Sequence, residues 1–110
     1  MAKFCLVVNS TAKPGRADEY SEWGRTQHLP DILRIPGVVA VKRYKVMVAS
    51  PEEQARFKTI IELDCDDPRD VMLEIGRRNG TPDMPRSDSY EPASVSITTL
   101  ELESECRTIT

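Results

Sequence analysis

The spacing of apolar residues changes along this chain, and the changes divide it into extended and helical segments. Residues 3 to 9 place apolar side chains on both faces of an extended segment, which is typical of a central strand. Residues 38 to 47 are rich in β-branched side chains but alternate imperfectly, which predicts a long strand with a bulge. Residues 57 to 64 and 94 to 100 alternate apolar and polar side chains and predict two further strands. The polar stretch 50 to 54 predicts a hairpin loop.

The first predicted helix lies between the first two strands. Residues 16 to about 28 contain no proline and no β-branched run, and they carry apolar and aromatic residues at helical spacing. Pro30 lacks a backbone donor and disfavours helical geometry in the residue before it, so we expect this helix to end near Pro30, with residues 31 to 35 adding an irregular or helical turn. Pro36 and Gly37 then predict a turn into the second strand.

The second predicted helix has a signal at each end. Asp67 can cap the free N–H groups of the first turn, and Pro68 suits the first helical position. Gly80 can adopt a positive φ shortly after a cationic last turn. We therefore expect a helix over residues 68 to 78.

The resulting order is β-α-β-β-α-β, which is typical of an α+β domain with a ferredoxin-like architecture. In that arrangement four antiparallel strands form one sheet, and both helices cover one of its faces. The other face is expected to be apolar as well, at or near Cys5, Val7, Val39 and Val41. A second copy of the chain would cover this face, so we expect residues 1 to 110 to form a single domain that assembles as a homodimer.

Composition and motifs exclude several classes of partner and cofactor. The formal net charge is −3 and the sequence pI is about 5.2. We therefore expect neither a strongly basic surface nor nucleic-acid binding. The apolar run at the N-terminus is too short for a secretory signal or a membrane span. The three cysteines are widely separated and show no Cys-x-x-Cys spacing, which favours reduced thiols in the cytoplasm. The single histidine has no nearby pair of carboxylates, so we expect no metal site. The sequence contains no nucleotide-binding motif and no serine-nucleophile motif, so we expect no cofactor.

His28 is the single histidine, and it is the side chain whose ordinary pKa lies closest to neutrality. It is therefore the candidate general acid or base, although a histidine at a helix end can equally interact with free carbonyl groups. Asp31 can orient the imidazole or cap the following turn. Two interpretations are also open for the other candidate residues. Tyr20 and Trp23 can form the wall of a ligand site or part of the core, and Tyr44 and Tyr90 can donate hydroxyl groups or fill the core. Arg43 can bind a carboxylate or be exposed to solvent.

The segment from Tyr20 to Val39 also resembles a known family. Trp23, then His28-Leu29-Pro30-Asp31, then Pro36-Gly37-Val38 is similar to the pattern of the EthD-like branch of the dimeric α+β barrel superfamily. The resemblance implies a ferredoxin-like fold, a homodimer, and a pocket between helices and sheet with the histidine at its mouth. Gly24 stands where the family often has a second aromatic residue, which implies a wider pocket beside His28.

Three functions are compatible with this resemblance. The first is a cofactor-independent lyase, cyclase or isomerase that uses His28 as general acid/base on an aromatic or polyketide-like small molecule. The second is a cofactor-free monooxygenase. The third is a non-catalytic dimeric accessory or ligand-binding protein. The residues expected to contact the ligand in addition to His28 are Tyr20, Trp23, Gly24, Asp31, Arg43, Tyr44 and Tyr90.

Overall fold

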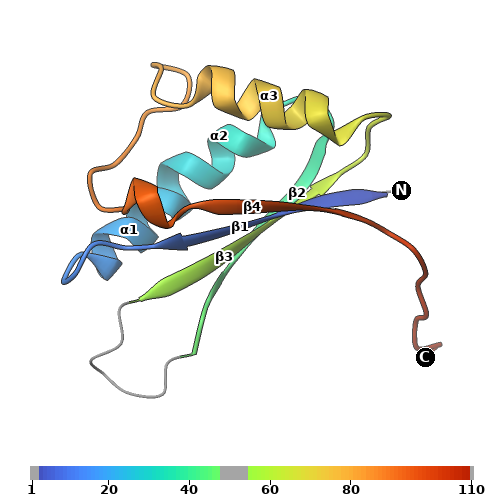
Figure 1. The fold of residues 1–110 in the computed structure, drawn as a ribbon, viewed down its shortest axis with the longest axis horizontal. Coiled ribbons are helices and arrows are strands. Elements are labelled where there is room, and N and C mark those ends of the chain that lie inside the picture. Colours follow the sequence, from blue (N-terminus) through green and yellow to red (C-terminus); the bar gives the residue numbers. More distant parts are fainter. Residues whose placement is uncertain (1–2, 48–54, 110) are drawn as a thin grey trace.

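The structure, a computed structural model, describes residues 3 to 47 and 55 to 109 (Figure 1). The strand Phe4–Thr11 (β1) and the strand Ser96–Glu101 (β4) are neighbours in space although they come from opposite ends of the chain. A short 3-10 turn, Pro92–Ser94, leads into β4. The predicted hairpin loop at residues 50 to 54 lies outside the described residues. The elements are β1 Phe4–Thr11, α1 Ala17–Trp23, a π-helical turn Gly24–His28, α2 Leu29–Leu33, β2 Val38–Lys45, β3 Arg56–Leu63, α3 Pro68–Arg78 and β4 Ser96–Glu101.

The four strands form one antiparallel sheet in the order β2-β3-β1-β4. All the helices cover the same face of this sheet, with α3 and α2 side by side above it in Figure 1. The predicted ferredoxin-like α+β fold is therefore confirmed. The apolar residues of β1 and β3 explain the two central strands, since a strand with neighbours on both sides buries most of its surface.

Helix α3 has the predicted bounds and the predicted cap. The Asp67 carboxylate accepts a hydrogen bond from the backbone N–H of Arg69 at 3.0 Å, which satisfies a free donor of the first turn. Gly80 adopts a φ of +84°, and a residue with a Cβ rarely adopts that conformation.

The first helix does not end near Pro30: the helical turn considered for residues 31 to 35 is its direct continuation as far as Leu33. The helical segment runs on from α1 through the π turn into α2, and it ends at Leu33. Pro30 lies in the first turn of α2, directly after the π turn, where the hydrogen-bonding register of the helix changes.

Strand β2 contains the predicted bulge, and the bulge corrects one assignment. The pairing with β3 shifts register between Val38 and Ala40. Val41 consequently pairs with Ile61 and packs against the core beneath the helices, not on the opposite face as expected. Val39 is 52% exposed.

The main core lies between the sheet and the helices. Its buried members are Leu6, Ile32, Ile35, Ile61, Leu63, Val71 and Met84. A second, smaller cluster of Ala12, Tyr20 and Phe57 lies at the end of the sheet under α1. Cys5, Cys65 and Cys106 are free thiols. None of the helices in the described part of the chain is long and apolar enough to cross a membrane.

Candidate functional site

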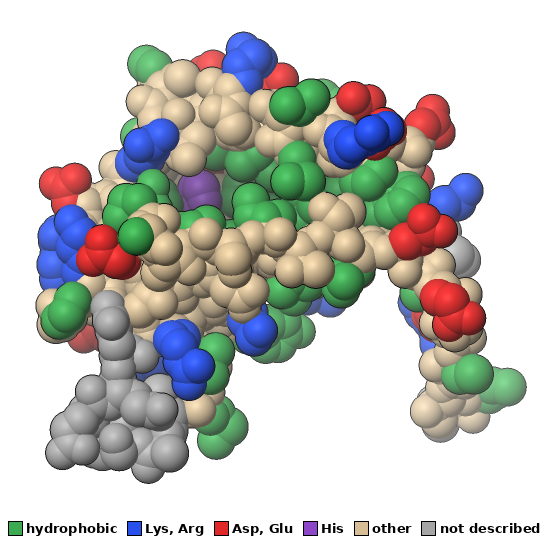
Figure 2. Space-filling model, viewed as in Figure 1, with side chains coloured by type: hydrophobic (Ala, Val, Ile, Leu, Met, Phe, Trp, Pro, Cys, Tyr) green, Lys and Arg blue, Asp and Glu red, His purple; other side chains and the backbone are tan. Residues whose placement is uncertain are grey.

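A cavity of about 350 Å³ lies between the helices and the sheet. In the space-filling view the histidine side chain is visible inside a hollow with hydrophobic side chains around it (Figure 2). Such a volume is at the lower end of the roughly 300–1,000 Å³ typical of small-molecule sites. The walls are mainly apolar, and they include Leu6, Val8, Ile32, Ile61, Met72, Ile75, Val95 and Ile97.

His28 lines this cavity and stacks on Trp23, with ring centroids 4.4 Å apart and an interplanar angle of 17°. These residues are five apart in the sequence, whereas residues on the same face of a regular α-helix are three or four apart. The π turn resolves the difference, because the N–H of Leu29 bonds to the carbonyl of Gly24, five residues earlier. The turn therefore brings the imidazole against the indole.

Burial keeps the imidazole of His28 neutral. The pKa of His28 is lowered from 6.5 to about 4, mainly by burial and then by the positive charge of Arg43, while Asp31 acts in the opposite direction. The Nδ1 atom of His28 is buried and has no hydrogen-bond partner among the described residues. A buried polar atom without a partner is rare in folded proteins, and in the wall of a cavity a bound ligand can satisfy it.

The aromatic side chains of Tyr20, Trp23 and Tyr90 form one wall of the cavity. Tyr20 is at the same time a buried member of the smaller core cluster. Trp23 is parallel to Tyr90, with centroids 5.8 Å apart, and its indole N–H donates to the carbonyl of Pro85 at 3.2 Å. The Tyr20 hydroxyl is 2.6 Å from the hydroxyl of Ser10 in a buried hydrogen bond. The indole is thereby fixed in place, and the phenol of Tyr20 already has a partner.

Arg43 extends from β2 into the same cavity. Its Nε donates to the Thr59 hydroxyl at 3.3 Å, and its Nη1 donates to the carbonyl of Tyr20 at 3.4 Å. The guanidinium carbon lies 4.5 Å from the centre of the Tyr20 ring, a cation–π distance. Gly24 makes room for this arrangement, because a Cβ at that position would lie 1.8 Å from Nη1 of Arg43.

Asp31 has neither of the two roles considered for it. Its buried carboxylate accepts hydrogen bonds from Gln27 at 2.7 Å and from Arg34, and it does not line the cavity. Helix α2 has no side-chain cap. Asp31 thus connects the π turn to the end of α2 and acts on His28 only through its charge.

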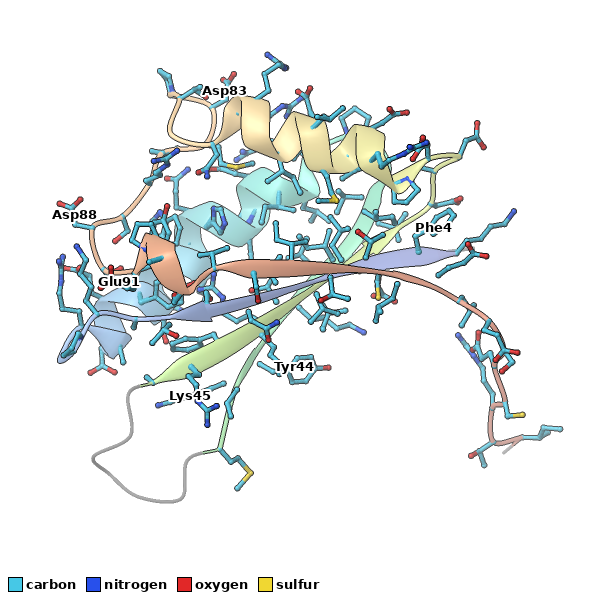
Figure 3. All side chains as sticks on the ribbon, in the orientation of Figure 1. Phe4, Tyr44, Lys45, Asp83, Asp88 and Glu91 are labelled. Atoms are coloured by element: carbon cyan, nitrogen blue, oxygen red, sulfur yellow. The ribbon has the colours of Figure 1, made fainter. Side chains whose placement is uncertain are left out.

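Tyr44 lies on the sheet face opposite the cavity, so it cannot contact a ligand bound there. It is 57% exposed, and in Figure 3 its side chain points away from the helices. The reason is the period of two in a strand: Arg43 faces the helices, and the next residue must face the other way.

Sequence reasoning missed four polar residues of the cavity wall: Ser10, Thr59, Asn79 and Arg86. A signal for two of them exists, since Ser10 and Thr59 are polar residues at positions of β1 and β3 where the alternation otherwise places apolar core residues. Arg86 and Asn79 come from the segment after α3, and the Arg86 Nε donates to the Asn79 side-chain oxygen at 3.3 Å. The described residues contain no group of three or more His, Cys, Asp or Glu side chains able to hold a metal ion.

Comparison with known proteins supports the fold. No family model matches the chain, and no curated protein matches it. A presumed antibiotic biosynthesis monooxygenase from Bacillus cereus superimposes with a TM-score of 0.63 at 13% identity, over 100% of both chains. An EthD family protein from Bacillus halodurans superimposes with a TM-score of 0.57 at 14% identity, over 91% of this chain and 99% of that one.

These similarities, together with the strand order, confirm that the chain has the ferredoxin-like α+β fold of the EthD-like and antibiotic biosynthesis monooxygenase structures. At this level of identity they establish the fold and not an activity.

Proposed function

We propose that this chain is a cofactor-independent enzyme that moves a proton on a small aromatic or polyketide-like molecule, as a lyase, cyclase or isomerase does, with His28 as general acid/base. One observation carries the proposal: a neutral imidazole, with a buried nitrogen that lacks a partner among the described residues, forms part of the wall of an apolar cavity. An imidazole in this state has a nitrogen lone pair ready to accept a proton.

The chemistry that fits this site is proton transfer at a phenol or at a carbon next to a carbonyl. The imidazole accepts a proton from the substrate and returns it at another atom, so no cofactor is consumed. Stacking on Trp23 holds the ring in one orientation, and the apolar walls keep water away from the developing anion. The nearby cation of Arg43 stabilises that anion.

A direct test does not need the natural substrate. The protein is incubated in D₂O with a panel of aromatic ketones and β-dicarbonyl compounds, and the exchange of carbon-bound protons is followed by NMR. We expect protein-dependent exchange for at least one compound. Binding of these compounds without any exchange would contradict the proposal and favour a ligand-binding or accessory protein.

A cofactor-free monooxygenase is the second candidate. The solved structure presumed to be an antibiotic biosynthesis monooxygenase has the same fold over the whole chain, and an aromatic cavity suits an electron-rich substrate. Oxygen consumption separates the two candidates, since proton transfer proceeds at full rate without oxygen and oxygenation does not.

We also propose that two copies of the chain pack through the sheet face opposite the cavity. At the Leu100 end, this face carries Cys5, Val7 and Ile60 on the central strands and Leu100 beside them, of which Leu100 is 45% exposed. Lys42 and Glu62 lie beside this apolar group on the same face and form an ion pair at 3.6 Å. None of the helices in the described residues covers that face (Figure 1), and a second copy would bury it by a symmetric contact. The localisation expected from the sequence, the cytoplasm, remains a proposal.

Substitution of Val7 by Lys tests the proposed dimer. The wild type is expected to sediment as a dimer, and Val7→Lys as a folded monomer, because the substitution places an unpaired charge beside Ile60 in the proposed contact on both copies. Ser96→Lys is the matched control on the same face, at the polar end formed with Asn9 and Lys58. Sedimentation of the wild type as a monomer at micromolar concentration contradicts the proposal.

A further inference from the structure

The guanidinium of Arg43 has no counter-ion in the part of the chain that the structure describes. Among the described residues no carboxylate forms an ion pair with it, and its two hydrogen bonds go to neutral oxygens of Thr59 and Tyr20. Burial lowers the pKa of Arg43, since the charged form loses water contacts. Arg43 is partly buried, and a charge withdrawn from water is costly unless it is paired, so its position beside a cavity indicates the sign of a suitable ligand.

The donors of Arg43 are also only partly used. A guanidinium has five N–H donors in a planar fork, and the described residues occupy one on Nε and one on Nη1. A carboxylate accepts two parallel hydrogen bonds from such a fork, which is the geometry for which arginine is selected. A second cation, Arg86, lines the same cavity, so the charged groups of its lining are of one sign.

The rest of the cavity selects the body of the ligand. Apolar residues from β1, α3 and β4 form most of its wall, and Trp23 and Tyr90 provide flat surfaces. A volume of about 350 Å³ admits a molecule of one or two fused rings but not a long chain.

We propose that the ligand is a small aromatic carboxylic acid, whose carboxylate pairs with Arg43 and whose ring lies against the apolar and aromatic wall. This inference rests on the proposed function, because it names the substrate class of the same site. Carboxylate binding also neutralises the charge of Arg43 near His28. Since that positive charge helps to keep the pKa of His28 low and Asp31 opposes it, the bound acid raises the pKa and makes the imidazole a stronger base.

Gly24 is a positioning residue for this interaction. A methyl group at residue 24 would overlap Nη1 of Arg43, which is the end of a flexible side chain and can move aside. Gly24 has φ −59° and ψ −50°, so alanine fits the helical backbone. Gly24→Ala is therefore expected to leave the fold intact and to displace the guanidinium without removing its charge.

Binding of two matched pairs of compounds tests the proposal: benzoate against benzamide, and naphthoate against naphthamide, by isothermal titration calorimetry. We expect the wild type to bind at least one acid about tenfold or more tightly than its amide. Arg43→Met removes this preference, Arg43→Lys retains part of it, and Gly24→Ala weakens it. Arg25→Met is the control, because Arg25 is an exposed arginine paired with Glu22. It keeps the full preference.

The outcomes separate this inference from the proposed function. Equal affinity for acid and amide, binding of neither, or an unchanged preference in Arg43→Met overturns the inference, even where proton exchange still depends on His28. A preference for the acids that Arg43→Met abolishes supports it, even where His28 proves dispensable for exchange. The ring signals of the single histidine give a second readout, since a bound acid is expected to raise the pKa of His28 in the wild type, and Arg43→Met is expected to raise it already in the free protein.

Discussion

Replacement of His28 by Gln is expected to slow protein-dependent proton exchange on the substrate by about a hundredfold to ten-thousandfold, the usual contribution of a positioned general base. Glutamine keeps a polar side chain of similar size at the cavity wall but cannot accept and release a proton near neutral pH. Fold and assembly are expected to persist, because the imidazole makes no hydrogen bond through Nδ1 among the described residues. Rates are measured by NMR under the same D₂O conditions for both proteins.

Tyr44→Phe is the control for this experiment. Tyr44 is a candidate from the sequence, but it lies on the opposite face of the sheet. Removal of the Tyr44 hydroxyl group is expected to leave the exchange rate unchanged. Exchange at the wild-type rate in His28→Gln would show that the imidazole is not the base.

Acid is expected to destabilise the protein through the same residue. The pKa of His28 in the folded state is about 4, below its ordinary value of 6.5. Above pH 6.5 neither state is protonated, and His28 has no effect on stability. As the pH falls from 6.5 towards 4, the unfolded chain binds a proton that the folded chain does not, so the free energy of unfolding decreases. The loss approaches about 3 kcal/mol near pH 4.

The measurement is urea unfolding of the wild type and of His28→Gln across this pH window. The groups that face His28 are Arg43 from β2, which lowers its pKa, and Asp31 from α2, which raises it. Both are retained in His28→Gln, and so are all other carboxylates, so the difference between the two proteins isolates the imidazole. The variant is expected to lose less stability than the wild type as the pH falls. Parallel curves would mean that the folded protein protonates His28 as readily as the unfolded chain does.

Local signals predicted the elements that depend on neighbouring residues. Asp67, Pro68 and Gly80 mark the two ends of α3, and the alternation in β3 places its core face correctly. These signals act over a few residues, so they can be read from the sequence directly. The order of elements then determined the ferredoxin-like topology.

The π turn could not be predicted in the same way. Helical periodicity assumes a constant register, and the register changes at Gly24 because the π turn makes hydrogen bonds across five residues. A glycine is needed at this position because the guanidinium of Arg43 occupies the space of a Cβ, and Arg43 lies on a strand nineteen residues further along the chain. The stacking of His28 on Trp23 and the room for the guanidinium therefore depend on tertiary contacts.

The cavity itself was only partly predictable. Trp23, His28 and Tyr90 stand out by residue type, and all of them line it. Tyr44 stands out equally but faces the other way, and the bulge in β2 moved Val41 to the core. Which face a strand residue occupies depends on register, and a single bulge changes it.

Successive residues of a strand lie on opposite faces of the sheet, and the two faces have different proposed roles. On β1, Leu6, Val8 and Ser10 line the cavity, while the residues between them lie on the face proposed to meet a second copy. Mutations at alternate positions can therefore alter which ligand is accepted while the surface for assembly stays constant. In a scaffold of this kind, substitutions at every second strand residue change the cavity and leave the proposed contact between two copies unaltered.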